Sequence, residues 1–112
     1  QQAVDYLLYT FRQEPHTTPS VTLCEEQIGG EVLSALIEQG HLVKLNEDVI
    51  FLTETYEEMH ARVVAHLREH GSITVAQVRD MFGTSRKYAL AFLGHLDEKR
   101  ITRRVGDERV LR

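Results

Sequence analysis

The feature that most constrains the fold is an internal duplication with an offset of 60 residues, in which residues 36–51 can be laid over residues 96–111. The pairs that carry the duplication are Leu45 with Val105, Asp48 with Glu108, Ile50 with Val110, Val4 with Val64 and Leu7 with Leu67. Each copy predicts the end of an amphipathic helix followed by a hairpin with a polar turn. We therefore expect two modules built on one plan, residues 1–54 and residues 55–112.

The second module shows the plan most clearly. Apolar residues at helical spacing predict a first helix over about 56–69, a second after a capping box at Thr74 and Gln77, and a third from Thr84 or Ser85 to near Lys99. Strands over 101–105 and 108–111 complete it. Two helices joined by a tight glycine turn and followed by a two-stranded ribbon are typical of a winged helix-turn-helix. The expected fold class is mostly α with small β-hairpins (α+β), as tandem winged helix-turn-helix modules.

The first module departs from the second in its connection and its charge. Its link over residues 14–20 is longer and contains two prolines, and its third helix, about 31–39, is shorter. Residues 1–55 carry two bases and nine acids, a formal charge of −7, whereas residues 56–112 carry eleven bases and eight acids, a charge of +3. A local patch, and not the total of −4, decides whether phosphate is attracted. We expect the first module to be a spacer and packing partner and the second to bind nucleic acid.

Composition indicates a soluble folded fragment of a longer protein. Hydrophobic residues make up 42% and charged residues 27%, and no apolar stretch approaches the roughly 18 residues of a membrane span. The chain starts at Gln1 without a leader sequence. The single cysteine, Cys24, lies in an apolar-periodic segment, so we expect a buried core residue in a reducing, cytoplasmic setting.

The third helix of the second module carries the candidate surface. The predicted buried stripe is Ala89, Phe92, Leu93 and Leu96. At about 100° per residue, the predicted outward positions are Lys87, Ala91, Gly94 and Glu98, flanked by Arg86, Leu90 and His95. Small residues on an exposed face either admit the close approach of a ligand or reflect neutral variation. Tyr88 and His95 lie on one flank, where either can stack on an unpaired base or simply pack at the edge of the core.

The start of this helix gathers groups that attract anions, namely hydroxyls, free amides and two cations, at Thr84, Ser85, Arg86 and Lys87. In the wing, Arg103 and Arg104 are adjacent in one strand and must face opposite sides, so at most one shares a face with Arg86. The helix start and the basic ribbon together predict a two-pronged clamp for a sugar-phosphate backbone. A merely solvated charged surface is the alternative.

Catalysis and metal binding are not indicated. His66 and His70 stand four residues apart on one helix, with His60 further back, but no Cys or carboxylate set completes a tetrahedral zinc site. No phosphate-cradling glycine loop and no Ser/His/Asp signature occurs. We expect no enzyme activity, no cofactor and no metal in this fragment.

Two motifs resemble a known family. Gly-Thr-Ser-Arg-Lys-Tyr-Ala at residues 83–89 and Thr-Arg-Arg-Val-Gly-Asp at residues 102–107 resemble the carboxy-terminal end of bacterial selenocysteine-specific elongation factors, and the similarity continues more weakly through residues 47–49. The resemblance implies the third and fourth winged helices of such a factor (SelB), without its GTPase. It implies that the fourth winged helix binds the selenocysteine insertion (SECIS) hairpin of the mRNA, at the apical loop of the hairpin and at a bulged or flipped base. The expected RNA-binding residues are Thr84, Ser85, Arg86, Lys87, Tyr88, Ala91, His95, Arg103, Arg104 and Gly106.

The same resemblance implies the partners. They are the mRNA hairpin, and, through the complete factor, the ribosome and selenocysteinyl-tRNA, with selenocysteine inserted at UGA. We expect a cytoplasmic monomer that contacts no membrane. Gly94 followed by His95 departs from the bulkier pair expected in the family, which leaves the hairpin sequence preference open. A DNA-binding winged-helix transcription regulator and a pure protein-interaction module are the alternatives.

Overall fold

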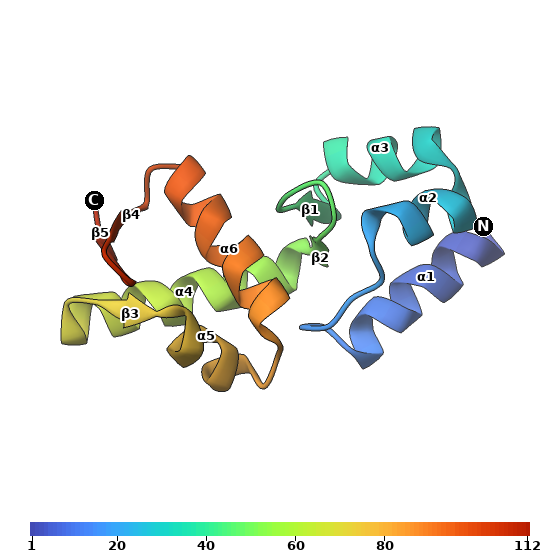
Figure 1. The fold of residues 1–112 in the computed structure, drawn as a ribbon. Helices are drawn as coiled ribbons and strands as arrows, with labels where there is room; N and C mark the ends of the chain where they lie inside the picture. Colours follow the sequence, from blue (N-terminus) through green and yellow to red (C-terminus); the bar gives the residue numbers. More distant parts are fainter. The chain divides into compact units, whose positions relative to one another are not determined.

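A computed structural model describes all 112 residues and contains six helices and five short strands (Figure 1). The chain divides into two compact units, unit 1 (Gln1–Tyr56) and unit 2 (Glu57–Arg112). Each unit combines helices with a small antiparallel sheet, so the predicted fold class, mostly helical with small sheets in winged-helix modules, is confirmed. None of the helices is long and apolar enough to cross a bilayer.

Unit 1 packs three helices and a two-stranded hairpin around one core. Its elements are α1 (Gln2–Gln13), α2 (Val21–Ile28), α3 (Gly30–Glu38), β1 (Leu42–Lys44) and β2 (Ile50–Leu52). Leu7 and Phe11 of α1 are completely buried in its core. Asn46 closes the hairpin turn, because its side-chain oxygen accepts hydrogen bonds from the amides of Asp48 and Val49 at 2.9 and 2.8 Å. The predicted hairpin and short third helix are confirmed.

Cys24 is a core residue of α2, as predicted. Its side chain is fully buried among the hydrophobic residues of unit 1. Burial raises the pKa of its thiol to about 11, so the reactive thiolate form is disfavoured.

Unit 2 contains the longest helix of the chain and a helix-turn-helix. Its elements are α4 (Thr53–His70, which begins before the boundary), β3 (Ile73–Thr74), α5 (Val75–Phe82), α6 (Arg86–Glu98), β4 (Thr102–Val105) and β5 (Glu108–Leu111). The capping box is present in both directions: the Gln77 amide donates to the Thr74 hydroxyl at 3.1 Å, and the Thr74 amide donates to the Gln77 side chain at 2.8 Å. Gly83 makes the turn to α6 with a left-handed backbone, φ +59°, which favours glycine.

The sheet of unit 2 has three strands where the sequence predicts two. β3 pairs with β5, so that the strand order is β3-β5-β4, and Ile73 and Thr74 lie opposite Arg109 and Glu108. This pairing was not predicted, because a two-residue strand leaves no alternation pattern to detect. Its consequence is that the first turn of α5 lies beside the wing, the β4–β5 hairpin.

The two N-caps of the helix-turn-helix give a matched test of this geometry. Thr74→Ala removes a side chain that caps α5, and we expect it to lower the free energy of unfolding by about 1 kcal/mol. Ser85→Ala is the control, since the Ser85 side chain makes no capping hydrogen bond to α6. Urea unfolding of the whole chain measures both, and an equal loss in the two variants would contradict the assignment.

Candidate nucleic-acid interface

The start of α6 presents a positively charged helix end to solvent. Ser85 is its N-cap residue, and the Ser85 carbonyl oxygen accepts hydrogen bonds from the amides of Tyr88 and Ala89 at 3.2 and 3.1 Å. No acidic residue lies in the first turn, and Arg86 and Lys87 are exposed. The first amides of a helix have no acceptor within it, so this end favours anions.

The wing places its two adjacent arginines on opposite faces. Arg104 lies opposite Arg109 of β5, whereas Arg103 lies opposite Val110. Side chains alternate between faces along a strand, so Arg104 and Arg109 share one face and Arg103 occupies the other. The prediction that at most one of the two shares a face with Arg86 is confirmed, and Arg104 is that residue.

A largely buried ion pair joins the wing to the last turn of α6. Arg109 is only 7% exposed, and its Nε and one terminal nitrogen each lie 3.1 Å from Oδ2 of Asp97. The other carboxylate oxygen of Asp97 accepts a hydrogen bond of 2.6 Å from the Thr102 hydroxyl. A single carboxylate therefore holds both wing strands, and we call Asp97, Thr102 and Arg109 the wing anchor.

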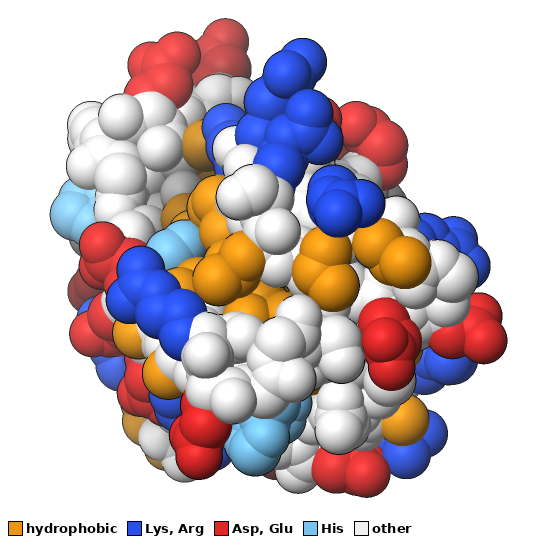
Figure 2. Space-filling view, turned by 90° about the vertical axis from the view of Figure 1, so that its left-hand side faces the viewer, with side chains coloured by type: hydrophobic (Ala, Val, Ile, Leu, Met, Phe, Trp, Pro, Cys, Tyr) orange, Lys and Arg blue, Asp and Glu red, His pale blue; other side chains and the backbone are white.

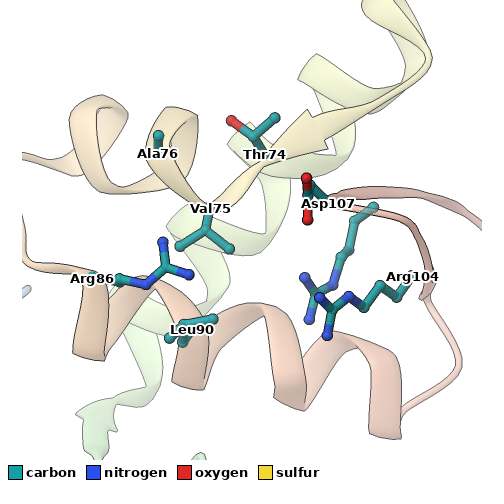
Figure 3. Close-up of a pocket in the computed structure, with 8 residues that line it drawn as sticks. Thr74, Val75, Ala76, Arg86, Leu90, Arg104 and Asp107 are labelled. Atoms are coloured by element: carbon teal, nitrogen blue, oxygen red, sulfur yellow. The ribbon is translucent and has the colours of Figure 1, made fainter.

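A hollow of about 300 Å³, here named the wing hollow, lies between the wing, α6 and the start of α5 (Figure 3). The residues that line it are Thr74, Val75, Ala76, Arg86, Leu90, Arg104, Asp107 and Arg109. Figure 3 shows Arg86 and Arg104 reaching toward this space from opposite sides, with Val75 and Leu90 close to Arg86. On the face of unit 2 that carries the β3-β5-β4 sheet, Figure 2 shows hydrophobic side chains exposed between lysine and arginine side chains. The hollow thus combines cationic groups with an apolar surface.

The buried stripe of α6 is confirmed, but its outward face is narrower than the predicted one. Ala89, Phe92, Leu93 and Leu96 are all fully buried. The outward position predicted for Ala91 and the flanking position predicted for His95 are wrong, because these side chains are only 5% and 7% exposed. The residues that do face solvent along α6 are Arg86, Lys87, Leu90, Gly94 and Glu98, which include the predicted outward positions of Lys87, Gly94 and Glu98. Neighbouring structure covers the Ala91 side of the helix as well, so the buried arc is wider than the predicted stripe.

The two candidates for stacking on a base differ in accessibility. Burial lowers the pKa of His95, with a further contribution from the charge of Lys99, and the ring lacks the exposed face that stacking needs. Tyr88 is half-buried, and the Lys87 ammonium lies 5.2 Å from the centre of its ring, a cation–π contact. Of the two aromatic side chains, only Tyr88 retains surface that a base can contact.

The remaining predicted residues serve the turns around the site. The Thr84 amide donates to the Arg79 carbonyl oxygen at 3.0 Å, so Thr84 closes α5 while Ser85 begins α6. Gly106 lies in the wing turn with φ +61°, a left-handed conformation that favours glycine. Its carbonyl oxygen accepts a 2.8 Å hydrogen bond from Nε of Arg104. Gly106 therefore supports the wing by its backbone.

Six residues that line the wing hollow were not among the predicted site residues: Thr74, Val75, Ala76, Leu90, Asp107 and Arg109. Three of them enter through the β3–β5 pairing, which brings the start of α5 to the wing. The β-branched residues Ile73 and Thr74, which make up β3, were a usable signal, because β-branched residues are enriched in strands. The ion pair between Arg109 and Asp97 was not predicted.

The histidines of α4 form a ring contact. The ring centres of His66 and His70 are 4.5 Å apart and tilted by 43°, and His70 also lies 3.9 Å from the Glu69 carboxylate. No group of three or more His, Cys, Asp or Glu side chains is arranged to hold a metal ion.

Fold and site together define a tandem winged-helix protein whose second unit carries a basic wing and a basic helix start. Residues 65–111 match the family model described as elongation factor SelB, winged helix. Among curated proteins, the selenocysteine-specific elongation factor of Desulfomicrobium baculatum is 29% identical over 82 residues, and that of Haemophilus influenzae is 32% identical over 74 residues. The alignments cover 73% and 65% of this chain but only 13% and 12% of those relatives.

Two solved structures share the fold along the whole chain. The mRNA-binding domain of elongation factor SelB from E. coli, in complex with SECIS RNA, has a TM-score of 0.76 at 21% identity and is matched over 98% of its length. A bacterial selenocysteine-specific elongation factor, EF-Sec, has a TM-score of 0.78 at 20% identity and is matched over 18%. Residues 65–111 therefore carry a winged helix of the SelB type, and the chain as a whole shares the fold of both structures. The matched family model describes a winged helix and not a catalytic domain.

The wing anchor predicts a large loss of stability on removal of its carboxylate. Asp97→Ala leaves the largely buried Arg109 without a counter-ion, and we expect the free energy of unfolding to fall by about 3 kcal/mol. Glu98→Ala is the matched control, since it removes an exposed carboxylate from the next position and is expected to change stability by less than about 0.5 kcal/mol. Urea unfolding distinguishes the two, and a small loss for Asp97→Ala would contradict the anchor.

Burial of His95 predicts a pH dependence of stability. Its pKa is lowered from the ordinary 6.5, so the unfolded chain takes up this proton first as the pH falls. The contribution of neutral His95 to the free energy of unfolding should therefore be complete above about pH 6.5. Below this pH the free energy of unfolding should decrease, until His95 also becomes protonated in the folded state. His95→Gln should reduce this slope in urea unfolding measured between pH 5 and 8, and His41→Gln, which replaces an exposed histidine, is the control variant.

Proposed function

We propose that this chain is the RNA-binding part of a selenocysteine-specific translation elongation factor and that unit 2 binds the SECIS hairpin of mRNA. The observation that carries the proposal lies in residues 65–111, the segment that matches the SelB winged-helix model. Within it, Arg86 and Arg104 face one hollow from a helix start and a wing. The E. coli domain that shares this fold was solved with SECIS RNA, which supports the assignment of the ligand.

The roles of the two modules follow from their charges in this proposal. Residues 55–112 are the RNA-binding module and residues 1–54 a spacer and packing module. Unit 1 carries a formal charge of −7 and unit 2 a charge of +3. Phosphate is repelled by the first surface and attracted by the second, because binding to a nucleic-acid backbone depends on local cations that replace its counterions.

The proposed contacts combine backbone attraction with base contact. The residues we assign to the interface are Ser85, Arg86, Lys87, Tyr88 and Arg104. Arg86, Lys87 and Arg104 supply cations for phosphate, and the half-buried Tyr88 offers a ring edge or face to an unpaired base. Ala91 and His95 are left out because they are buried, and Arg103 because it lies on the other face of the wing.

In the complete factor, this segment would act by binding and without catalysis of its own. The GTPase and the sites for selenocysteinyl-tRNA and the ribosome would belong to the rest of the protein, which would act in the cytoplasm. Holding the hairpin would place that complex at a UGA codon and direct selenocysteine to it. We expect the segment itself to be monomeric.

Binding of a DNA duplex is the rival function for a winged helix. A competition titration separates the two, with a labelled SECIS hairpin displaced by unlabelled hairpin, duplex RNA or duplex DNA at several salt concentrations. The proposal requires the hairpin to compete best at every salt concentration. Stronger competition by duplex DNA would replace it with the DNA-binding function.

Charge-matched variants locate the interface. Arg86→Gln with Lys87→Gln removes two cations from the start of α6, and we expect at least about tenfold weaker hairpin binding and a salt slope lower by about two units. Arg12→Gln with Lys44→Gln is the control, because it removes the only two bases of residues 1–55 and gives the same net charge. Equal affinities of the two double variants, measured by fluorescence anisotropy, would remove this helix start from the interface.

A further inference from the structure

Arg86 and Arg104 are cations without counter-ions that face the same space. Neither forms an ion pair with any carboxylate, although both line the wing hollow. Nε of Arg104 donates to the Gly106 carbonyl oxygen at 2.8 Å. That bond holds the guanidinium in place and leaves its two terminal amino groups as donors toward the hollow. The arrangement is that of a receptor for an anion.

The fold does not require this concentration of positive charge. Arg104 lies directly opposite Arg109 across the wing, and like charges at such positions destabilise a strand pair. In the hairpin of unit 1, whose register differs, the residue equivalent to Arg104 is Lys44, and it lies opposite the fully buried Ile50, so that hairpin contains no pair of like charges at this position. The second arginine in unit 2 therefore calls for an explanation outside the fold.

The charge balance of the hollow indicates the class of anion. Its lining contains three arginines, Arg86, Arg104 and Arg109, and one carboxylate, Asp107. Asp97, paired to Arg109 from outside the hollow, neutralises one further positive charge, which leaves a balance of +1. A phosphodiester carries one negative charge, whereas a phosphate monoester carries about −1.5 to −2 at neutral pH. The hollow is thus matched to a phosphodiester.

We propose that the wing hollow holds one particular phosphodiester of the bound RNA, between Arg86 and Arg104. This inference rests on the proposed RNA-binding function and adds to it a single fixed linkage. Val75 and Ala76, the first residues of α5, also line the hollow, and the Thr74 side chain caps only the Gln77 amide. The amides of a first helical turn have no acceptor within the helix, so those of Val75 and Ala76 would be further donors in this proposal. Val75 and Leu90 give an apolar surface for the adjoining sugar.

The consequence is that the hollow sets the register of the RNA on unit 2. A diffuse basic patch would accept any phosphate and would lose affinity evenly as charges are removed. Two arginines that face one hollow from opposite sides would instead hold a single phosphate between them. Binding should then depend strongly on one linkage of the hairpin and weakly on the others.

Arg103 and Arg104 provide a matched pair of variants. Arg104→Gln and Arg103→Gln change the net charge equally in adjacent residues of one strand, but only Arg104 lines the hollow. We expect Arg104→Gln and Arg86→Gln each to weaken hairpin binding about tenfold, and Arg103→Gln to weaken it less than about twofold. Circular dichroism and urea unfolding verify that each variant is folded. Equal losses for Arg103→Gln and Arg104→Gln would overturn the proposal.

A series of hairpins with one uncharged methylphosphonate linkage each tests the phosphodiester itself. Every hairpin is compared with one that has an ordinary linkage at the same modified nucleotide. With the unaltered chain and with Arg103→Gln, we expect one linkage whose neutralisation weakens binding about tenfold. With Arg104→Gln, neutralising that linkage should cost little more. The proposal is overturned if no single linkage stands out, or if the sensitive linkage is unaffected by Arg104→Gln.

These results are distinguishable from a failure of the proposed function. If the hairpin does not bind better than duplex DNA, the proposed function is wrong, and this inference is then wrong as well. If it binds well but every linkage contributes equally, only the inference fails. Inorganic phosphate, added at constant ionic strength, should not displace the hairpin better than chloride. Displacement by millimolar phosphate would make the hollow a site for free phosphate and would also overturn the proposal.

Discussion

The ion pair between Asp97 and Arg109 is the constraint on which the rest of the site depends. A largely buried guanidinium is tolerated only where its charge and its N–H groups find partners, and Asp97 supplies two contacts of 3.1 Å. Through its other oxygen, the same carboxylate holds Thr102 at 2.6 Å. The wing is thereby fixed against α6, and β5 in turn pairs with β3. The relative positions of Arg104, Arg86 and the start of α5 all follow from this anchor.

The placement of charge matters more here than its amount. The chain as a whole is acidic, with a formal charge of −4, and unit 2 reaches only +3. Two of its cations stand without counter-ions around one hollow, while Arg79 is paired with Asp80 and Arg109 with Asp97. A phosphate senses charges within about a Debye length, about 8 Å at physiological salt, so this local arrangement outweighs the net charge.

Local signals in the sequence were sufficient for most of the fold but for only part of the site. The capping box at Thr74 and the buried stripe of α6 depend on neighbours along the chain, and the structure confirms them. The β3–β5 pairing, the partner of Arg109 and the burial of Ala91 and His95 depend on contacts between separate elements. A helical wheel gives the direction of each side chain but not how many neighbours cover the helix.

The exposed face of α6 favours RNA hairpin binding over recognition of a duplex groove. A recognition helix that lies in a major groove reads base edges with several polar side chains along its exposed face. Along α6 that face runs from Arg86 through Leu90 and Gly94 to Glu98, so its only cations lie in the first turn and its last member is an acid. The site is therefore compact, a helix start and a wing around one hollow. A footprint of this size suits a backbone bend or a loop, where a few phosphates and unstacked bases come together.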